Sequence, residues 1–416
     1  MEPLSLENLL NISVNALNYM DARLTGHAER VAYFMALILE DSPRFTGDEQ
    51  CRLIWTALLH NLGSLRDPSS LKDRTLSPSC SSYLFLKHFS PFPEYALPIL
   101  FHHPRYLQAD LSGRIDGKLK WTAECLNVID TLDRYHIAHP EIRSQELSTY
   151  LSGLSSAFAS PMSIHLACVL AEKLEKEGRP LFPPQKEIHF FLLERLKKLD
   201  LTEKEKYKLL YTLVNAMDFR SHYTAVHCNT VTRVSSLLSG LCGLSSRHGQ
   251  QVYLGALLHD LGKIAIPLRV LESPGRLTGS DWTIMKAHVK ITESILKGNV
   301  PEEVLQIAVR HHETLDGRGY PWGFKGPELT LPQRIVAVSD IVSALSERRS
   351  YKEPFPFEKI LSIIQDMSRR GKLCPYVVDV CSRNQILLKK ELQEISSHVA
   401  SSYQKLQAEY ALLTNI

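Results

Sequence analysis

The sequence carries one pattern of histidines twice, about 200 residues apart. The segment 21–31, which contains His27, resembles 221–231, which contains His227. Likewise TALLHNLG at 56–63 resembles GALLHDLG at 255–262. Three further anchors follow in the same order: His88 with His288, His102-His103 with His311-His312, and Asp130 with Asp340. Self-similarity that keeps its order is typical of repeated structural units, so we predict two copies of one domain.

Both copies are expected to be all-α. Apolar residues recur at three- and four-residue intervals, which is the period of an amphipathic helix, and no convincing series of alternating strands is present. This spacing predicts helices over 6–20, 187–198, 204–217 and 357–367 and a long terminal helix over 389–413. Clusters of Pro, Gly, Asp and Ser predict loops at 67–70, 91–93 and 316–332.

The proline-containing stretch GRPLFPPQ, at 178–185, is the best candidate for a boundary between the two copies. We therefore predict an N-terminal domain over 1–185. The second domain would cover 186–416 and include a connecting helix and the C-terminal helix.

Composition excludes several classes of protein. The 48 basic and 45 acidic residues leave a net charge of only +3, which gives no reason to expect DNA or RNA polymers as partners. No run of 18 apolar residues is present to span a membrane, and the first residues lack the features of a signal peptide. The eight cysteines form no CxxC pair, so we expect reduced thiols in a cytoplasmic protein.

The second copy combines residues that suit a metal centre. His259 and Asp260 end an apolar helix, and a buried imidazole beside a buried carboxylate is costly unless both are paired or bound to metal. The candidate ligands are His227, His259, Asp260, His288, His311, His312 and Asp340. Seven nitrogen and oxygen donors fit two divalent transition metals, with Asp260 as the natural bridge. Two such metals, about 3.5–4 Å apart, could activate a bridging water for phosphoester hydrolysis.

The motifs HDLGK at 259–263 and HHETLDGRGYP at 311–321 closely resemble the HD-GYP family of the HD phosphohydrolase superfamily. The resemblance covers roughly 205–370. It implies two tandem HD-type helical domains, the second a metallophosphodiesterase of cyclic dinucleotides, chiefly cyclic di-GMP, in bacterial signalling. The expected product is linear pGpG, with further conversion to GMP left open.

The same resemblance implies roles for individual residues. One metal would be held by His227, His259, Asp260 and Asp340; the other would be held by His288, His311 and His312, with Asp260 shared. Asp260 and Lys263 are the expected catalytic residues, with Lys263 on the scissile phosphate. Lys263, Arg349 and Lys352 supply charge for phosphates, and Tyr320 supplies a face for a base.

This copy departs from the family pattern at a few positions. Ser221 and Ser343 stand where acidic residues are common, and Arg348 and Ser350 replace an acidic residue and a proline. Tyr223 occupies the position that, in some members, holds a third metal, so we expect two metals. Fe or Mn is favoured, while Zn, Co or Ni could also occupy the site.

Two other functions stay open. The intact pocket could belong to a receptor that binds a cyclic dinucleotide without hydrolysing it. The protein could also hydrolyse another phosphoester, such as a hybrid cyclic dinucleotide. Homodimerisation through the terminal helix is a further possibility that the sequence does not decide.

The first copy differs at the bridging position. It contains His27, His60, His88, His102, His103 and Asp130, but Asn61 stands where the bridging aspartate is expected. A neutral amide does not offset the charge of two cations, Ser64 replaces the lysine, and no DGxGYP loop follows His103. We expect this copy to be non-catalytic, with a regulatory or structural role, and its capacity to bind metal stays open.

Overall fold

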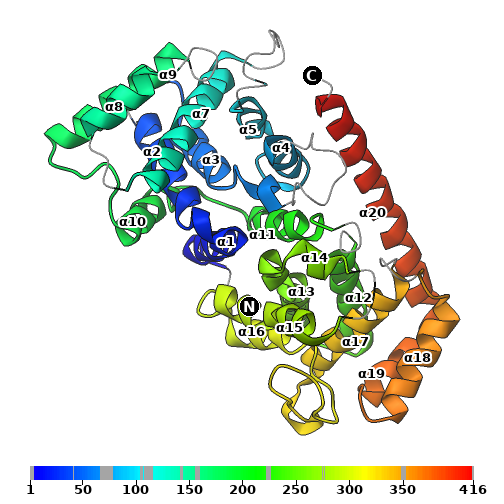
Figure 1. Cartoon of the computed structure of the whole chain (residues 1–416). Coiled ribbons are helices and arrows are strands. Elements are labelled where there is room, and N and C mark those ends of the chain that lie inside the picture. The colour runs from blue at the N-terminus through cyan, green and yellow to red at the C-terminus, as the bar shows by residue number, and fades with distance from the viewer. Residues whose placement is uncertain are drawn as a thin grey trace. The chain divides into compact units, whose positions relative to one another are not determined.

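The computed structural model of the chain describes residues 4–40, 42–65, 78–103, 106, 116–140, 144–154, 160–221, 226–273, 275, 277–347 and 353–414. These residues form helices joined by short connections and loops (Figure 1). The β-structure among them is one isolated bridge between Asp316 and Lys325. The predicted all-α fold is confirmed.

The chain divides into two compact units. The N-terminal unit contains Ser5–Thr212 and Ala408–Ile416, and the C-terminal unit contains Met1–Leu4 and Leu213–Gln407. The division falls later than the proline-containing segment at 178–185. The reason is that helix α10 (Gln185–Leu196) buries Ile188, Leu192 and Leu196 and packs on helices of the N-terminal unit.

The N-terminal unit contains nine α-helices among its described residues before 197. They are α1 (Leu6–Met20), α2 (His27–Glu40), α3 (Gly47–Leu58), α4 (Pro78–Phe89), α5 (Leu97–Phe101), α7 (Gly117–Ala138), α8 (Ser144–Ser152), α9 (Pro161–Lys176) and α10. Three 3₁₀-helices accompany them: η1 (Ala22–Leu24), η2 (Leu62–Leu65) and η3 (Pro93–Tyr95).

Helix α11 (Glu203–Asp218) begins in the N-terminal unit and ends in the C-terminal unit. The helices that follow are α12 (His227–Leu241), α13 (Ser246–Leu258), η4 (Leu261–Ala265), α14 (Leu268–Leu271), α15 (Gly279–Leu296), α16 (Glu302–Val309), η5 (Gly326–Glu328), α17 (Leu331–Ser346), α18 (Phe357–Arg369), α19 (Pro375–Arg383) and α20 (Gln385–Thr414). The helices predicted over 6–20, 187–198, 204–217, 357–367 and 389–413 are confirmed as α1, α10, α11, α18 and α20.

The two units repeat one packing scheme. In the N-terminal unit α2 packs on α3 and α7, and α4 packs on η2; in the C-terminal unit α12 packs on α13 and α17, and α15 packs on η4. The start of α3 is capped by a Thr46–Glu49 capping box, and Ser245 caps α13 by accepting the backbone N–H of His248. Caps of this kind satisfy the unpaired N–H groups of a first helical turn. The second member of each helix pair therefore begins at a defined residue, which sets where its C-terminal histidine lies.

The core of the C-terminal unit is built mainly from branched aliphatic residues. Valines and isoleucines of α12, α13 and α17 meet there, and the amphipathic helices α18 and α19 cover them with residues such as Ile364 and Val377. Burial of such side chains contributes about 1.5–3 kcal/mol each. The eight cysteines are free and seven of them are buried. Among the described residues, no helix is long and apolar enough to cross a membrane.

Candidate metal centre

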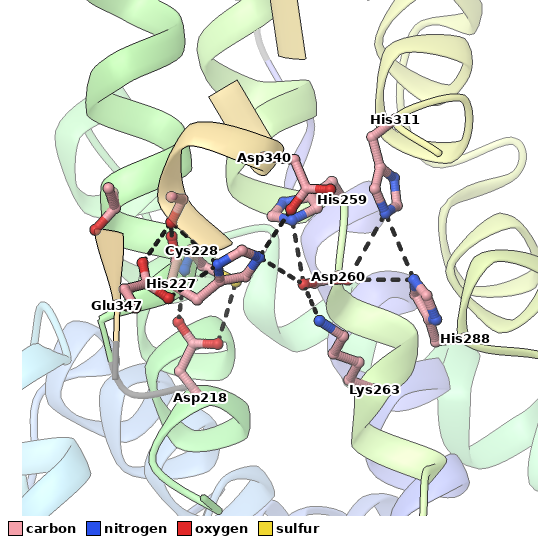
Figure 2. Close-up of polar contacts among 12 residues, drawn as sticks. Asp218, His227, Cys228, His259, Asp260, Lys263, His288, His311, Asp340 and Glu347 are labelled. Carbon is pink, nitrogen blue, oxygen red and sulfur yellow. Dashed lines mark hydrogen bonds and ion pairs between the residues drawn. The ribbon is translucent and has the colours of Figure 1, made fainter. Parts of the chain in front are cut away.

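Asp260 lies where α13 passes into η4, and its carboxylate is central to a cluster of polar side chains (Figure 2). The same turn carries Gly262 against α15. A Cβ at Gly262 would lie 2.0 Å from the carbonyl oxygen of His288, and the Gly262 N–H donates to Thr292 Oγ1 at 2.8 Å. A residue without a side chain is required for so close an approach. Gly262 thereby brings Asp260 and His288 together.

Two histidines face one oxygen of Asp260. Oδ2 of Asp260 lies 3.3 Å from Nε2 of His227 and 3.2 Å from Nε2 of His259. Asp340, on α17, places Oδ1 3.1 Å from the same nitrogen of His227. Three separate helices, α12, α13 and α17, thus direct nitrogen and oxygen donors toward one point.

The other oxygen of Asp260 faces a second group of histidines. Oδ1 of Asp260 lies 3.3 Å from Nε2 of His288 and 3.8 Å from Nε2 of His311. His312 completes this group, with Nδ1 3.5 Å from Oδ2 of Asp340. One ligand atom from each of these three histidines lies within 4.8 Å of the others. The structure therefore brings all seven predicted ligands into one cluster, with Asp260 between its halves.

Backbone carbonyls set the tautomer of several of these imidazoles. In three of them Nδ1 lies 2.6 or 2.7 Å from the carbonyl oxygen three residues earlier; they are His259, His288 and His311. A carbonyl only accepts, so Nδ1 carries the hydrogen and Nε2 of the neutral ring carries the lone pair. Such a contact orients a metal-ligating histidine and fixes its tautomer.

Two buried atoms at the centre have no hydrogen-bond partner: Nε2 of His259 and Oδ1 of Asp260. Their side chains are 0% and 1% exposed. Leaving such atoms unsatisfied is costly, and a cation between them would offset that cost. Imidazole nitrogens with carboxylate oxygens suit divalent first-row transition metals. The residues present therefore fit a metal centre.

Burial keeps the second group of histidines neutral. Desolvation lowers the pKa of His288 to about 4 and that of His312 to about 3. Burial, together with the adjacent His312, also holds the pKa of His311 well below its usual value. At neutral pH these rings are uncharged, which is the state that a metal ligand needs.

Lys263, on η4, provides a positive charge beside the bridging position. Its Nζ lies 2.5 Å from Oδ2 of Asp260. Burial alone would raise the pKa of Asp260, but His259 and Lys263 hold it well below its usual range. Burial opposes the charge on Lys263, yet Asp260 raises its pKa above the usual value. Both groups are therefore ionised at neutral pH.

A buried carboxylate orders the loop after the paired histidines. Glu313 accepts three backbone N–H groups at 2.9–3.2 Å, from Trp322, Gly323 and Phe324. A Cβ at Gly319 would lie 2.4 Å from the Cα of Glu313, so the chain requires glycine there. No role was predicted for Glu313 from its sequence motif. A charged residue in the middle of the motif was the available signal.

The ordered loop places Tyr320 beside the cluster. Its ring stacks on His312 with centroids 4.6 Å apart, and Trp282 meets it edge-on at 5.7 Å. The other two predicted substrate contacts, Arg349 and Lys352, lie outside the described residues, as does Tyr223.

Glu347 is a residue of the site that the sequence analysis missed. Its Oε2 lies 3.2 Å from Nδ1 of His227, and Ser343 Oγ lies 3.0 Å from the same nitrogen. The Ser343 hydroxyl also donates to Glu347. The available signal was Ser343 standing where an aspartate is usual, with a carboxylate one helical turn later. Glu347 thus orients His227 from the side opposite its Nε2.

Asp218 supports the start of the same helix. It accepts the backbone N–H of Cys228 at 3.2 Å, where α12 has no side-chain cap from its own N-cap residue. Burial raises the pKa of Asp218 to about 7. This contact fixes the first turn of α12, from which His227 projects.

The N-terminal unit brings only part of the corresponding set together. His27, His60 and Asp130 form a cluster of possible ligand atoms. His88 does not join them: its Nε2 lies 3.2 Å from Oε2 of Glu409, and its side chain is 28% exposed. His102 is buried, with Nδ1 2.6 Å from a backbone carbonyl oxygen.

The predicted correspondence of His88 with His288 is wrong. In the C-terminal unit Gly262 packs on the carbonyl of His288 and donates to Thr292; in the N-terminal unit the equivalent glycine, Gly63, packs on the carbonyl of Pro78 and donates to Ser82. Pro78 therefore occupies the place of His288. Relative to the first copy, the second copy contains about ten extra residues, and these lie before the helix that carries His288 and not after it. The offset of 200 between the earlier anchors therefore selected His88 instead of Pro78.

Comparison with known proteins agrees with this geometry. Residues 208–377 match the family model of the HD domain. This part of the C-terminal unit is therefore similar to the HD domain. That match contains all seven residues of the cluster, and it confirms the resemblance to the HD phosphohydrolase superfamily.

Proteins that are similar to this chain in sequence include phosphodiesterases. The chain is 36% identical over 177 residues to 3'3'-cGAMP-specific phosphodiesterase 2 of Vibrio cholerae, covering 42% of this chain and 33% of that protein. It is 37% identical over 211 residues to the cyclic di-GMP phosphodiesterase of Thermotoga maritima, covering 49% and 56%. The chain thus spans about a third to just over half of the length of these relatives.

A solved structure resembles nearly the whole chain. The crystal structure of a cyclic GMP-AMP-specific phosphodiesterase from V. cholerae, V-cGAP3, aligns with a TM-score of 0.57 at 19% identity, covering 94% of this chain and 98% of that one. At this identity the likeness establishes a shared fold, and the fold includes both units.

Proposed function

We propose that the HD domain is a metal-dependent phosphodiesterase that hydrolyses a cyclic dinucleotide, with cyclic di-GMP as the first candidate and linear pGpG as its product. The observation that carries the proposal is the seven-residue cluster around Asp260, lying directly beside the ordered loop that holds Tyr320. The names of the relatives support this substrate class.

The metals would be held by His227, His259, Asp260 and Asp340 on one side and by His288, His311 and His312 on the other, with Asp260 shared. When bound, two divalent cations supply the Lewis acidity that activates water and stabilises charge on the phosphodiester. Iron or manganese is our first choice, and Zn, Co or Ni also suit these ligands.

The side chains of this unit have distinct parts in the reaction. Lys263, ionised and 2.5 Å from Asp260, would contact the phosphate whose P–O3′ bond breaks as a water oxygen adds to phosphorus. Its ammonium would donate a proton to the leaving 3′ oxygen. Tyr320 would pack against a base, and Arg349 and Lys352 would bind the phosphates.

A cytoplasmic site of action belongs to this proposal, and the eight free cysteines favour it. We also propose that the N-terminal unit is not catalytic, because Asn61 and Pro78 occupy the places of Asp260 and His288. Dimerisation through α20 stays a prediction.

The test uses the purified full-length chain, loaded with Fe²⁺ or Mn²⁺ under reducing conditions and mixed separately with cyclic di-GMP and 3'3'-cGAMP. Product chromatography should show a linear dinucleotide. Asp260→Asn should lower turnover by more than about 100-fold, because loss of a ligand exceeds the usual effect of a mutated outer-shell partner. Asp281→Asn makes the same chemical change on the surface of α15, where Asp281 pairs with Arg269, and should retain full activity.

Each alternative predicts a different result. Tight binding of cyclic di-GMP with no linear product would identify a receptor and overturn the proposed hydrolysis. Turnover of 3'3'-cGAMP alone would move the substrate to a hybrid cyclic dinucleotide. Undiminished turnover by Asp260→Asn would contradict the bridging assignment.

A further inference from the structure

Three donor atoms of the N-terminal unit converge on one point. Nε2 of His27 lies 3.2 Å from Nε2 of His60 and 3.2 Å from Oδ1 of Asp130, and His60 Nε2 lies 3.5 Å from the same oxygen. The residues come from three elements: the start of α2, the turn after α3, and α7. His27 and His60 are buried at 2% and 0% exposure.

Hydrogen bonds at the other nitrogens show which way the lone pairs point. Nδ1 of His60 lies 2.7 Å from the carbonyl oxygen of Ala57, and Nδ1 of His27 lies 2.6 Å from Oδ2 of Asp133. Both Nδ1 atoms therefore donate, and in the neutral rings both Nε2 atoms present lone pairs. Two lone pairs 3.2 Å apart, with a carboxylate oxygen beside them, do not stabilise one another. A cation among them does.

We propose that the N-terminal unit binds a single divalent transition-metal ion through His27, His60 and Asp130. Two imidazole nitrogens and one carboxylate oxygen form a donor set that zinc and ferrous iron both accept, with positions left for water. Asn61 adds an adjacent amide, since its Nδ2 lies 2.8 Å from His27 Nε2. In the structure this Nδ2 donates to the lone pair of His27, so a cation at this point requires the amide to rotate and present its oxygen instead.

Neighbouring side chains orient the three ligands through hydrogen bonds, as they do around metal sites in general. Asp133 is fully buried, and it accepts from Nδ1 of His27 and from Arg30, whose Nη2 lies 3.0 Å from it. A carboxylate behind a histidine raises the basicity of that ligand and fixes its orientation. Asp130 is held by Arg134 at 2.9 Å on its outer side. The ligands are thus positioned before the cation arrives.

The site holds one ion and not two because the second half of the cluster lacks its bridging carboxylate and one histidine, although His102 is still buried there. Asn61 replaces the bridging carboxylate, so it adds no charge to offset a second cation. Pro78 replaces His288 and offers no donor atom. His88 lies at the surface with Glu409.

The alternative occupant of this point is a proton. A doubly protonated His27 would pair with Asp130 and Asp133. Burial lowers the pKa of His27, but these two carboxylates outweigh that effect and raise the pKa above its usual value. A proton and a metal ion make opposite predictions for metal content, so the experiment distinguishes them.

The experiment uses the full-length chain with Asp260→Asn, which weakens the C-terminal centre. The protein is stripped with chelator, loaded with Co²⁺ or with Zn²⁺, and desalted; metal per chain is then measured by mass spectrometry, and Co²⁺ by its visible absorption. Adding His60→Ala should remove one equivalent of metal. His88→Ala, added to the same background, removes a histidine outside the cluster and should remove none.

Asp130→Asn provides a second variant of nearly unchanged shape, in case His60→Ala fails to fold. The Asp130→Asn variant should also lose one equivalent of metal. Co²⁺ should raise the midpoint of thermal unfolding of the parent protein and leave that of Asp130→Asn unchanged. Equal metal content in the parent, His60→Ala and Asp130→Asn proteins would overturn the proposal in favour of a protonated His27. Loss of the same equivalent in His88→Ala would also overturn it.

Discussion

At the scale of single residues, the site depends on hydrogen bonds that face away from it. His259, His288 and His311 each donate Nδ1–H to a backbone carbonyl three residues earlier, so Nε2 is free to ligate. His227 begins its helix and has no such carbonyl, and Glu347 with Ser343 takes that part. In the N-terminal unit Asp133 does the same for His27. The carboxylate behind the first histidine is present in both units, but it lies at different positions of the helix.

Glu347→Gln should weaken the orientation of His227, because the neutral amide supports the ligand less than a carboxylate does. We expect metal affinity to fall by about 10- to 100-fold. The kcat should decrease, while KM should change less. The measurement is a metal-dependence curve of activity together with a competitive metal titration.

Ser343→Asp is the matched rescue for that variant. It places the carboxylate where Asp133 stands in the N-terminal unit, and the double variant Ser343→Asp/Glu347→Gln should regain most of the affinity. A Glu347→Gln protein with unchanged metal affinity would show that the contact is merely structural.

The low pKa values of the buried histidines make the metal-free protein sensitive to acid. For His312 the pKa in the folded protein is about 3, against 6.5 in an unfolded chain. Between those values the unfolded state binds a proton that the folded state does not, so stability falls as pH falls. His312→Gln removes this contribution, and its stability relative to the wild type should rise as the pH is lowered from 6.5 toward 4. Denaturant unfolding of chelated protein at several pH values measures the difference, and a difference that does not change with pH would contradict the assignment.

At the scale of helices, each unit contains a close approach between the turn after its second core helix and the helix that follows. Gly262 packs on α15, and Gly63 packs on α4 in the same way. This contact sets which residue of the following helix faces the cluster. The residue whose carbonyl meets the glycine is His288 in one unit and Pro78 in the other.

Gly262→Ala should destabilise the C-terminal unit by about 1–3 kcal/mol, because its Cβ would overlap the backbone of α15. Bound metal should decrease with it, since α15 carries His288. Gly240→Ala is the matched control: no atom lies within 4 Å of a Cβ there, and the exposed helix should gain up to about 1 kcal/mol. Equal effects of the two substitutions on thermal unfolding would refute the close-approach argument.

At the scale of the whole chain, a repeated fold carries two unequal sites. One unit has a carboxylate bridge and donors on both of its sides. The other has Asn61 in place of the bridge and Pro78 in place of one histidine, while His102 keeps the same backbone contact as His311. The packing of α2, α3 and α7 matches that of α12, α13 and α17, so the fold does not require the complete set of ligands. The difference lies in a few side chains.

Asn61→Asp tests how far the N-terminal unit differs from the C-terminal unit in its capacity to bind a second metal ion. In the Asp260→Asn background it should leave the metal content of that unit at one equivalent, because Pro78 still offers no donor to a second ion. Metal analysis of this variant beside its parent measures the change. A gain of a full equivalent would show that the other histidines converge on a second ion after all.

The sequence by itself determined the helical repeat and the seven residues that cluster in the C-terminal unit, because residue types that bind metal, repeated in the same order, leave few other arrangements. Only the tertiary structure decided that Glu347 supports His227 and that Pro78, not His88, stands in the place of His288. Both depend on how helices distant in the sequence pack against each other. The sequence shows that ten more residues separate His259 from His311 than separate His60 from His102, but only the packing of the helix shows that the extra residues lie before it.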